Sequence, residues 1–250
     1  MKSERDLRIF PDAPALFEAA AQDFVQQTKA AIEARGRFTV ALSGGSTPKG
    51  LFQFLSGKDR DLLPWHKMFF FWGDERHVPP GNSDSNYRMA WDTLLSKVPI
   101  PEQNILRVPA EIPDAAQVAA QYEETLKQFF GLAAGQLPEF DLIHLGMGPD
   151  GHTASLFPQT KGLKEMKRLV IANWVEKFKT FRITLTIPVL NAAREVEFLI
   201  AGADKAPALH EVLEGDESPE LYPSKAIQPV QGKLVFLLDQ SAAANLKLRA

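Results

Sequence analysis

Short apolar runs alternate along this chain with longer segments in which apolar residues recur every three or four positions. A continuous apolar run of this kind predicts a buried strand, whereas the wider spacing predicts an amphipathic helix. The predicted strands are residues 38–42, 68–72, 140–145, 169–172, 182–187, 196–201 and 234–238. The predicted helices run from 12 to 36, 48 to 55, 87 to 95, 114 to 131, 206 to 213 and 240 onward, with a short one opening at 188.

The two longest predicted helices carry typical ends. Asp12 and Asp114 are preferred N-cap residues, and Gly36 and Gly131 supply the left-handed residue that ends many helices. Strands that alternate with helices favour an α/β fold: a mostly parallel Rossmann-like sheet with helices on both faces, with room for a small α/β subdomain. Because no internal repeat or linker interrupts the pattern, we expect residues 1–250 to form a single domain.

The charge, the cysteine count and the length of the apolar runs argue against several classes of protein. A net charge of −3 and a pI near 6.0 argue against nucleic-acid binding. The chain has no cysteine, which excludes disulfides, a thiolate nucleophile and a cysteine-based zinc site. No apolar run approaches the roughly 20 residues of a membrane span, and the first residues lack the apolar core of a signal peptide. We therefore expect a cytoplasmic protein with no membrane partner.

Polar or glycine-rich segments follow four of the predicted strands. They are residues 43–47, 73–76, 146–152 and 202–205. In a mostly parallel sheet these segments share one edge, and ligands bind outside the carboxyl ends of the strands. The sequence therefore predicts one site to which all four contribute.

The segment Ser43-Gly44-Gly45-Ser46-Thr47 joins a strand to a helix. Free N–H groups and hydroxyls at such a junction are typical of an anion site, although a tight turn with Ser46 or Thr47 as helix cap would look the same. The spacing is not that of a Walker A loop. A nucleophile elbow, Gly-x-Ser-x-Gly, fails at Pro48.

The segment that begins at Gly146 matches G-x-G-x-x-G, the dinucleotide fingerprint, and it follows a strand. That motif must open a long helix, but Pro158 cuts the following segment short. Asp150 and His152 suit a different function, in which the imidazole acts as a general base oriented by the carboxylate. Taken alone, the segment is equally compatible with a glycine-rich turn that carries two solvated polar residues.

The remaining candidates are charged residues at the same predicted edge. Asp74 and Arg76 follow the second strand, while Arg182 and Lys205 are cations near the later strands; each alone is compatible with a surface charge. His144 lies within a predicted strand and is interpreted as a core residue. No histidine pair has the helical spacing of metal ligands, so we predict no metal.

Together these segments resemble the glucosamine-6-phosphate deaminase/6-phosphogluconolactonase superfamily, and within it the lactonases. The stretch GMGPDGHTASLFP at 146–158 carries most of the resemblance. The other matching stretches are 43–48, 73–76, 85–87, 182–186 and 202–206, in the expected order. The resemblance implies hydrolysis of 6-phospho-glucono-1,5-lactone, a reaction that needs no metal or redox cofactor. We expect the protein to be a monomer or a weak homodimer.

The resemblance also implies roles for the residues. His152 would activate water and Asp150 would orient His152. As substrate-positioning residues, Arg76 would lie near the sugar or phosphate, and Asp74 would hold hydroxyls or position Arg76. The substrate phosphate would be held by Gly44, Gly45, Ser46, Thr47, Arg182 and Lys205.

Two alternatives remain beside lactone hydrolysis. In the deaminase branch the corresponding loop resembles G-x-G-x-D-G-H-I-A-F-N-E-P, where the late glutamate assists ring opening; here that position is Phe157, which cannot transfer protons. Where the deaminase branch has Asp-Glu-Tyr, this chain has Asp74-Glu75-Arg76. A non-catalytic sugar-phosphate-binding protein would need the phosphate loop but not His152.

Overall fold

A six-stranded parallel sheet forms the centre of the molecule in the computed structural model, which describes residues 5–57 and 60–247. The strand order is β1-β9-β8-β5-β2-β3, and every neighbouring pair is parallel. The strands are β1 (Arg5–Phe10), β2 (Phe38–Leu42), β3 (Met68–Trp72), β5 (Leu142–Leu145), β8 (Glu195–Ile200) and β9 (Lys233–Asp239). The predicted parallel sheet is confirmed, with β1 as an additional strand that the apolar pattern did not indicate.

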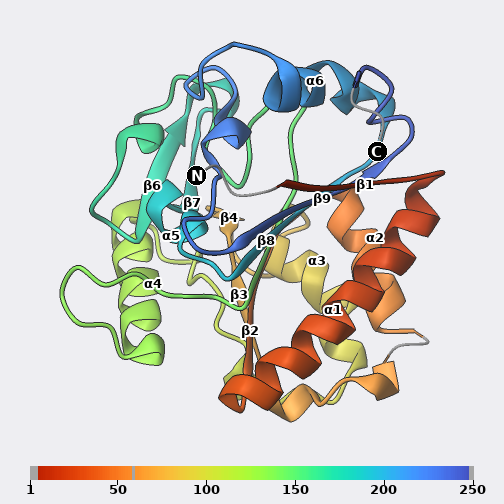
Figure 1. The fold of residues 1–250 in the computed structure, drawn as a ribbon. Helices are drawn as coiled ribbons and strands as arrows, with labels where there is room; N and C mark the ends of the chain where they lie inside the picture. The colour runs from red at the N-terminus through yellow and green to blue at the C-terminus, as the bar shows by residue number, and fades with distance from the viewer. Residues whose placement is uncertain (1–4, 58–59, 248–250) are drawn as a thin grey trace.

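Helices cover both faces of this sheet, as predicted (Figure 1). Phe24 of α1 packs on Phe38 of β2 with ring centroids 5.3 Å apart. On the opposite face, Phe129 and Phe130 of α4 pack on Phe71 of β3 at 5.0 and 5.8 Å. The helices are α1 (Ala13–Arg35), α2 (Ser46–Leu55), α3 (Asn86–Thr93), α4 (Ala115–Phe130), α5 (Ile187–Asn191) and α6 (Ala206–Glu214).

The predicted ends of the two longest helices are confirmed. The Asp12 carboxylate accepts a hydrogen bond from the N–H of Ala15, and Asp114 accepts from the second and third residues of α4. Gly36 and Gly131 adopt φ values of 74° and 63°, the left-handed conformation that glycine enters without steric cost. Local sequence signals therefore determine where these helices begin and end.

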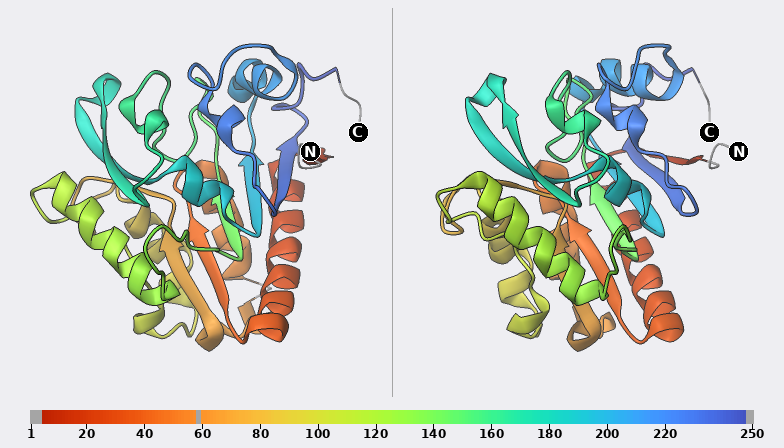
Figure 2. Two further views of the ribbon diagram at one scale, coloured as in Figure 1. Left: turned by 60° about the vertical axis from the view of Figure 1, so that its left-hand side comes forward. Right: turned by 90° about the vertical axis from the view of Figure 1, so that its left-hand side faces the viewer.

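A second, three-stranded sheet lies beyond the carboxyl ends of the parallel strands (Figure 2). It consists of β4 (Asp74–Arg76), β7 (Thr180–Leu185) and β6 (Val170–Val175), all antiparallel. Gly73 connects the two sheets, since its N–H donates to Leu42 O and its carbonyl accepts from Leu185 N. The sequence predicted 73–76 only as a polar segment after a strand, and in the structure residues 74–76 of that segment pair with β7.

The predicted helix from residue 240 is also wrong. Residues 240–245 form turns, because the Asp239 carboxylate accepts hydrogen bonds from Ser241 Oγ and from the N–H groups of Ala242 and Gly202. These bonds fold the chain back at the end of β9. Among the described residues, no helix is both long and apolar enough to cross a membrane.

Candidate active site

A cavity of about 220 Å³ opens at the carboxyl ends of β2, β5 and β8. The parallel sheet changes winding direction between β2 and β5, which is where α/β sheets bind ligands. All four polar segments contribute to its wall. The lining residues are Ser43, Gly44, Gly45, Ser46, Thr47, Pro48, Asp74, Arg76, Asn86, Gly146, Met147, Gly148, Pro149, His152, Ala154, Leu199, Ile200, Ala201 and Lys205.

His152 and Asp150 form a hydrogen-bonded pair in the loop after β5. His152 Nδ1 lies 2.5 Å from Asp150 Oδ1, so Nε2 is the ring nitrogen that stays available to take a proton. Partial burial disfavours the charged carboxylate, but the hydrogen bond and charge of His152, with Lys177 nearby, outweigh it and hold the pKa of Asp150 well below its usual range. Asp150 therefore stays ionised. It faces the side of the loop away from the cavity, which His152 lines.

The aromatic ring of Phe157 lies flat against the His152 imidazole. The ring centroids are 4.0 Å apart and the planes differ by 23°. Phe157 is itself buried, with 7% of its surface exposed, so it provides a fixed wall for the imidazole. The imidazole is thus held at its edge by Asp150 and on one face by Phe157.

Gly148 is required by the position of His152. A Cβ at residue 148 would lie 2.0 Å from His152 Nδ1, far inside contact distance. Gly151 turns the loop with φ of 73° and packs against Tyr222. Gly148 and Gly151 allow the imidazole and the backbone to approach closely, which accounts for two of the three glycines of the G-x-G-x-x-G pattern without a long helix after it.

The phosphate-loop candidate leads directly into α2. Gly45 is the N-cap, with φ of 107°, and no side chain caps the helix. The expectation that Ser46 or Thr47 could serve as cap is therefore not met, because both residues lie inside the first turn. An uncapped first turn leaves N–H groups for a ligand, and the helix dipole favours an anion there.

Asp74 and Glu75 are buried acids whose oxygens accept hydrogen bonds from the protein. Asp74 Oδ2 accepts from Ser155 Oγ at 2.6 Å, and Asn86 Nδ2 donates to the Asp74 carbonyl. Glu75 accepts from the N–H groups of Asn86 and Tyr87 at the start of α3. Burial raises the pKa of Glu75, while these backbone bonds oppose that rise. Glu75 therefore anchors α3 beside the cavity.

Arg76 and Arg182 lie directly opposite each other on β4 and β7. Burial, and then the positive charge of Arg76, lower the pKa of Arg182. Like charges placed opposite on a ladder repel each other, so an anion between these guanidinium groups would relieve the repulsion. Arg76 lines the cavity but Arg182 does not; Lys205 lines it from the other side and pairs with Asp204 at 2.9 Å.

Three residues near the site had no role assigned from the sequence. Asn86 lines the cavity and packs so tightly on Gly44 that a Cβ there would lie 1.8 Å from its Oδ1. Ser155 bonds Asp74, and Lys177 Nζ lies 3.4 Å from Asp150 Oδ2. The Ser85-Asn86 helix start was a usable signal for Asn86. The contact of Lys177 joins residues 27 positions apart and has no local signature.

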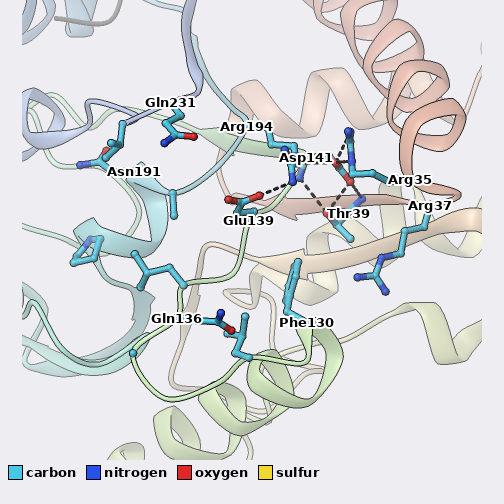
Figure 3. Close-up of a pocket in the computed structure, with 16 residues that line it drawn as sticks. Arg35, Arg37, Thr39, Phe130, Gln136, Glu139, Asp141, Asn191, Arg194 and Gln231 are labelled. Carbon is cyan, nitrogen blue, oxygen red and sulfur yellow. Dashed lines mark hydrogen bonds and ion pairs between the residues drawn. The ribbon is translucent and has the colours of Figure 1, made fainter. Parts of the chain in front are cut away.

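A larger pocket of about 680 Å³ lies at the opposite, amino-terminal ends of β2, β5 and β8 (Figure 3). Arg35 pairs with Asp141 at 2.7 Å, and Arg194 pairs with Glu139. Its charged groups thus largely compensate one another, and none of the predicted site residues lies there. The smaller cavity, which His152 and all four polar segments line, is the candidate active site.

Comparisons with known proteins show which family the chain resembles. The family model described as glucosamine-6-phosphate isomerases/6-phosphogluconolactonase matches residues 11–236. A 6-phosphogluconolactonase from Nostoc sp. is 44% identical over 98% of this chain and 100% of its own length. One from Synechocystis sp. is 49% identical over 87% and 88%.

Solved structures also resemble this chain in fold. The 6-phosphogluconolactonase from Trypanosoma cruzi superposes with a TM-score of 0.88 at 30% identity, covering 99% of both chains. A monomeric glucosamine-6-phosphate deaminase superposes with a TM-score of 0.80 at 18% identity over 96% of this chain and all of its own, which shows a shared fold alone. The chain belongs to the glucosamine-6-phosphate isomerase/6-phosphogluconolactonase family.

Proposed function

We propose that this chain is a 6-phosphogluconolactonase, which hydrolyses 6-phospho-D-glucono-1,5-lactone to 6-phospho-D-gluconate in the oxidative pentose phosphate pathway. One observation supports the proposal independently of the names of the relatives. Asp150 hydrogen-bonds the edge of the His152 imidazole and Phe157 packs on its face, in a cavity that is also lined by cationic side chains. A general base beside a bound anion is what hydrolysis of a phosphorylated lactone requires.

In the proposed mechanism Asp150 accepts the Nδ1–H of His152, which leaves Nε2 unprotonated. Nε2 removes a proton from a water molecule as the water oxygen forms a bond to C1 of the lactone. The resulting tetrahedral intermediate collapses by breaking the bond between C1 and the ring oxygen. The imidazolium returns its proton to that oxygen, so the product is the open-chain acid and the free base is restored.

The phosphate anchors the other end of the substrate. We assign it to the uncapped first turn of α2, with Gly44, Gly45, Ser46 and Thr47, and to the charges of Arg182 and Lys205. Arg76 lies opposite Arg182 and adds its positive charge to the proposed phosphate site. Asp74 supports the adjacent cavity wall by accepting a hydrogen bond from Ser155. Binding energy from the phosphate would align C1 with His152 without taking part in the chemistry.

Phe157 separates this reaction from its nearest alternative, a deaminase or isomerase. In the deaminase-like loop a glutamate at this position assists ring opening, whereas here an aromatic ring packs on the imidazole. The purified protein should therefore release no ammonia from glucosamine 6-phosphate. A phosphosugar-binding protein without catalysis would bind the ligand but would not accelerate hydrolysis of the lactone.

The deciding experiment measures proton release from freshly generated 6-phosphogluconolactone, with a chelator present. Wild-type protein should accelerate hydrolysis, and His152→Ala should reduce turnover by at least about 10²-fold while phosphosugar binding changes little. His66→Ala is the matched control, since His66 is an exposed histidine away from the cavity. Wild-type turnover in His152→Ala would remove this histidine from the mechanism.

A second experiment tests the phosphate site. Lys205→Ala and Arg182→Ala should each raise KM more than they lower kcat, because the phosphate contacts lie away from the reacting carbonyl. An unchanged KM in both variants would place the phosphate elsewhere. The single-domain organisation, the cytoplasmic location and the monomeric or weakly dimeric state stay predictions.

A further inference from the structure

The turn that joins β6 to β7 contacts both of the residues that hold the His152 imidazole. This turn, a 3₁₀ segment over Glu176–Phe178, places Lys177 Nζ 3.4 Å from Asp150 Oδ2. The next residue, Phe178, packs its ring edge-on against Phe157 with centroids 5.7 Å apart. One turn therefore contacts both groups that hold the His152 imidazole, the carboxylate at its edge and the aromatic ring on its face.

The position of the turn is fixed by the hairpin and by Phe178. β6 and β7 stay in register up to the pair Val175–Thr180, and Lys179 closes the turn with φ of 48°. The Arg182 guanidinium lies 5.2 Å from the Phe178 ring centroid. These contacts hold the Lys177 backbone close to the loop after β5, although the Lys177 side chain itself is 61% exposed.

The charge of Lys177 acts on the pair through the second carboxylate oxygen. Asp150 directs Oδ1 to the imidazole and Oδ2 to the ammonium group. An ammonium group beside this carboxylate offsets part of the negative charge that would otherwise stabilise a protonated imidazole. The charged residues that line the cavity together with His152 are Asp74, Arg76 and Lys205. The pocket that Asp150 lines on the other side of the loop also contains Lys161, Glu165, Glu176 and Lys177, and Tyr222 packs against Gly151.

We propose that Lys177 is a positioning residue of the lactonase reaction: it holds the Asp150 carboxylate in place and sets the pH at which the Asp150–His152 pair becomes an effective base. The proposal rests on the proposed function, because it assigns Lys177 a role through His152. Lys177 touches neither the cavity nor a predicted substrate group. Its effect should therefore appear in the pH profile rather than in substrate binding.

The test compares kcat/KM across pH in four variants. Lys177→Met should move the acid limb to higher pH by about 0.3–0.8 units, and Lys177→Glu should move it further in the same direction. Lys177→Arg should restore the wild-type profile, since it keeps the charge. Lys179→Met is the matched control, because Lys179 lies two residues away in the same turn and is exposed.

Salt separates a local charge effect from a structural one. At about 1 M salt the Debye length falls to about 3 Å, so the difference between Lys177→Met and wild type should shrink. An acid limb that does not move in the Met and Glu variants, or that moves equally in Lys179→Met, would overturn the proposal. Failure of the proposed function looks different: the wild-type protein would then not accelerate lactone hydrolysis at any pH, whatever residue occupies position 177.

Discussion

Position 148 shows how closely the site is built around one side chain. The space that a Cβ would take there is occupied by His152 Nδ1, 2.0 Å away, and by Asp150 Oδ1, 2.7 Å away. Nothing lies within 4 Å of a Cβ built at Gly146, two residues earlier in the same loop. The two glycines therefore differ in function although the sequence pattern presents them as equivalent.

Gly148→Ala should displace the imidazole and reduce kcat/KM by about 10²-fold or more, because small misplacements of a catalytic group are costly. Gly146→Ala should retain activity within a few-fold. Lactone turnover of both variants, with circular dichroism to confirm folding, checks this prediction. Equal losses in the two variants would mean that the loop backbone, and not the imidazole position, controls activity.

At the scale of single residues, the sequence predicted contacts that are local. Asp150 and His152 are two positions apart in one loop, and their pairing follows from the chain alone. The stacking of Phe157 on His152 and the contact of Lys177 with Asp150 depend on how the loop and the hairpin come together. A single sequence contains no signal for such contacts, so Phe157 was recognised only as the position of a missing glutamate.

At the scale of elements, the sequence predicted which segments form strands better than it predicted which strands pair with each other. The apolar runs near β6 and β7 were identified, but their antiparallel pairing with each other and with β4 depends on the change of sheet at Gly73. β1 was missed because it is a charged edge strand, with Arg5, Asp6 and Arg8 along its length. Such charges are common on exposed edges, where they oppose aggregation and weaken the apolar pattern.

The junction of β2 with α2 offers a test at the element scale. Asn86, at the start of α3, lies against Gly44 and hydrogen-bonds the Asp74 carbonyl, so it joins the phosphate loop to β4. Gly44→Ala should push these elements apart and raise KM by about 10-fold or more. Gly81→Ala, where a Cβ meets nothing within 4 Å, is the control. Unchanged kinetics in Gly44→Ala would show that Asn86 does not support the loop.

At the scale of the whole molecule, the sheet carries a second group of buried titratable residues, away from the site. His144 of β5 lies opposite Glu197 of β8, with His144 Nε2 3.3 Å from Glu197 Oε2. On the same strand Glu195 is 6% exposed and accepts a hydrogen bond from Gln27 of α1. Burial, and then repulsion from Glu197, raise the pKa of Glu195 to about 7. These groups lie beneath α1, and the raised pKa of Glu195 makes the stability of the protein depend on pH.

The sign of that dependence follows from the two protonation states. The pKa of Glu195 is raised from 4.5 to about 7 by folding, so folding favours the protonated acid. Its contribution is full below pH 4.5 and is lost as the pH rises through 7. Glu195→Gln keeps an oxygen for Gln27 and removes the ionisation, so the variant should exceed wild type in unfolding free energy by about 1–3 kcal/mol at pH 8.

Urea unfolding at pH 5 and pH 8 measures this difference. The gap between Glu195→Gln and wild type should be small at pH 5 and wide at pH 8, whereas Glu33→Gln, at an exposed position of α1, should show no such change. Lactone turnover at neutral pH should be similar in all three proteins, because Glu195 lies outside the cavity lining. A difference in unfolding free energy that stays constant between the two pH values would mean that Glu195 is ionised in the folded protein without cost. Lys233 and Arg8, the cations that lower the pKa of Glu195, would then be responsible for stabilising its charge.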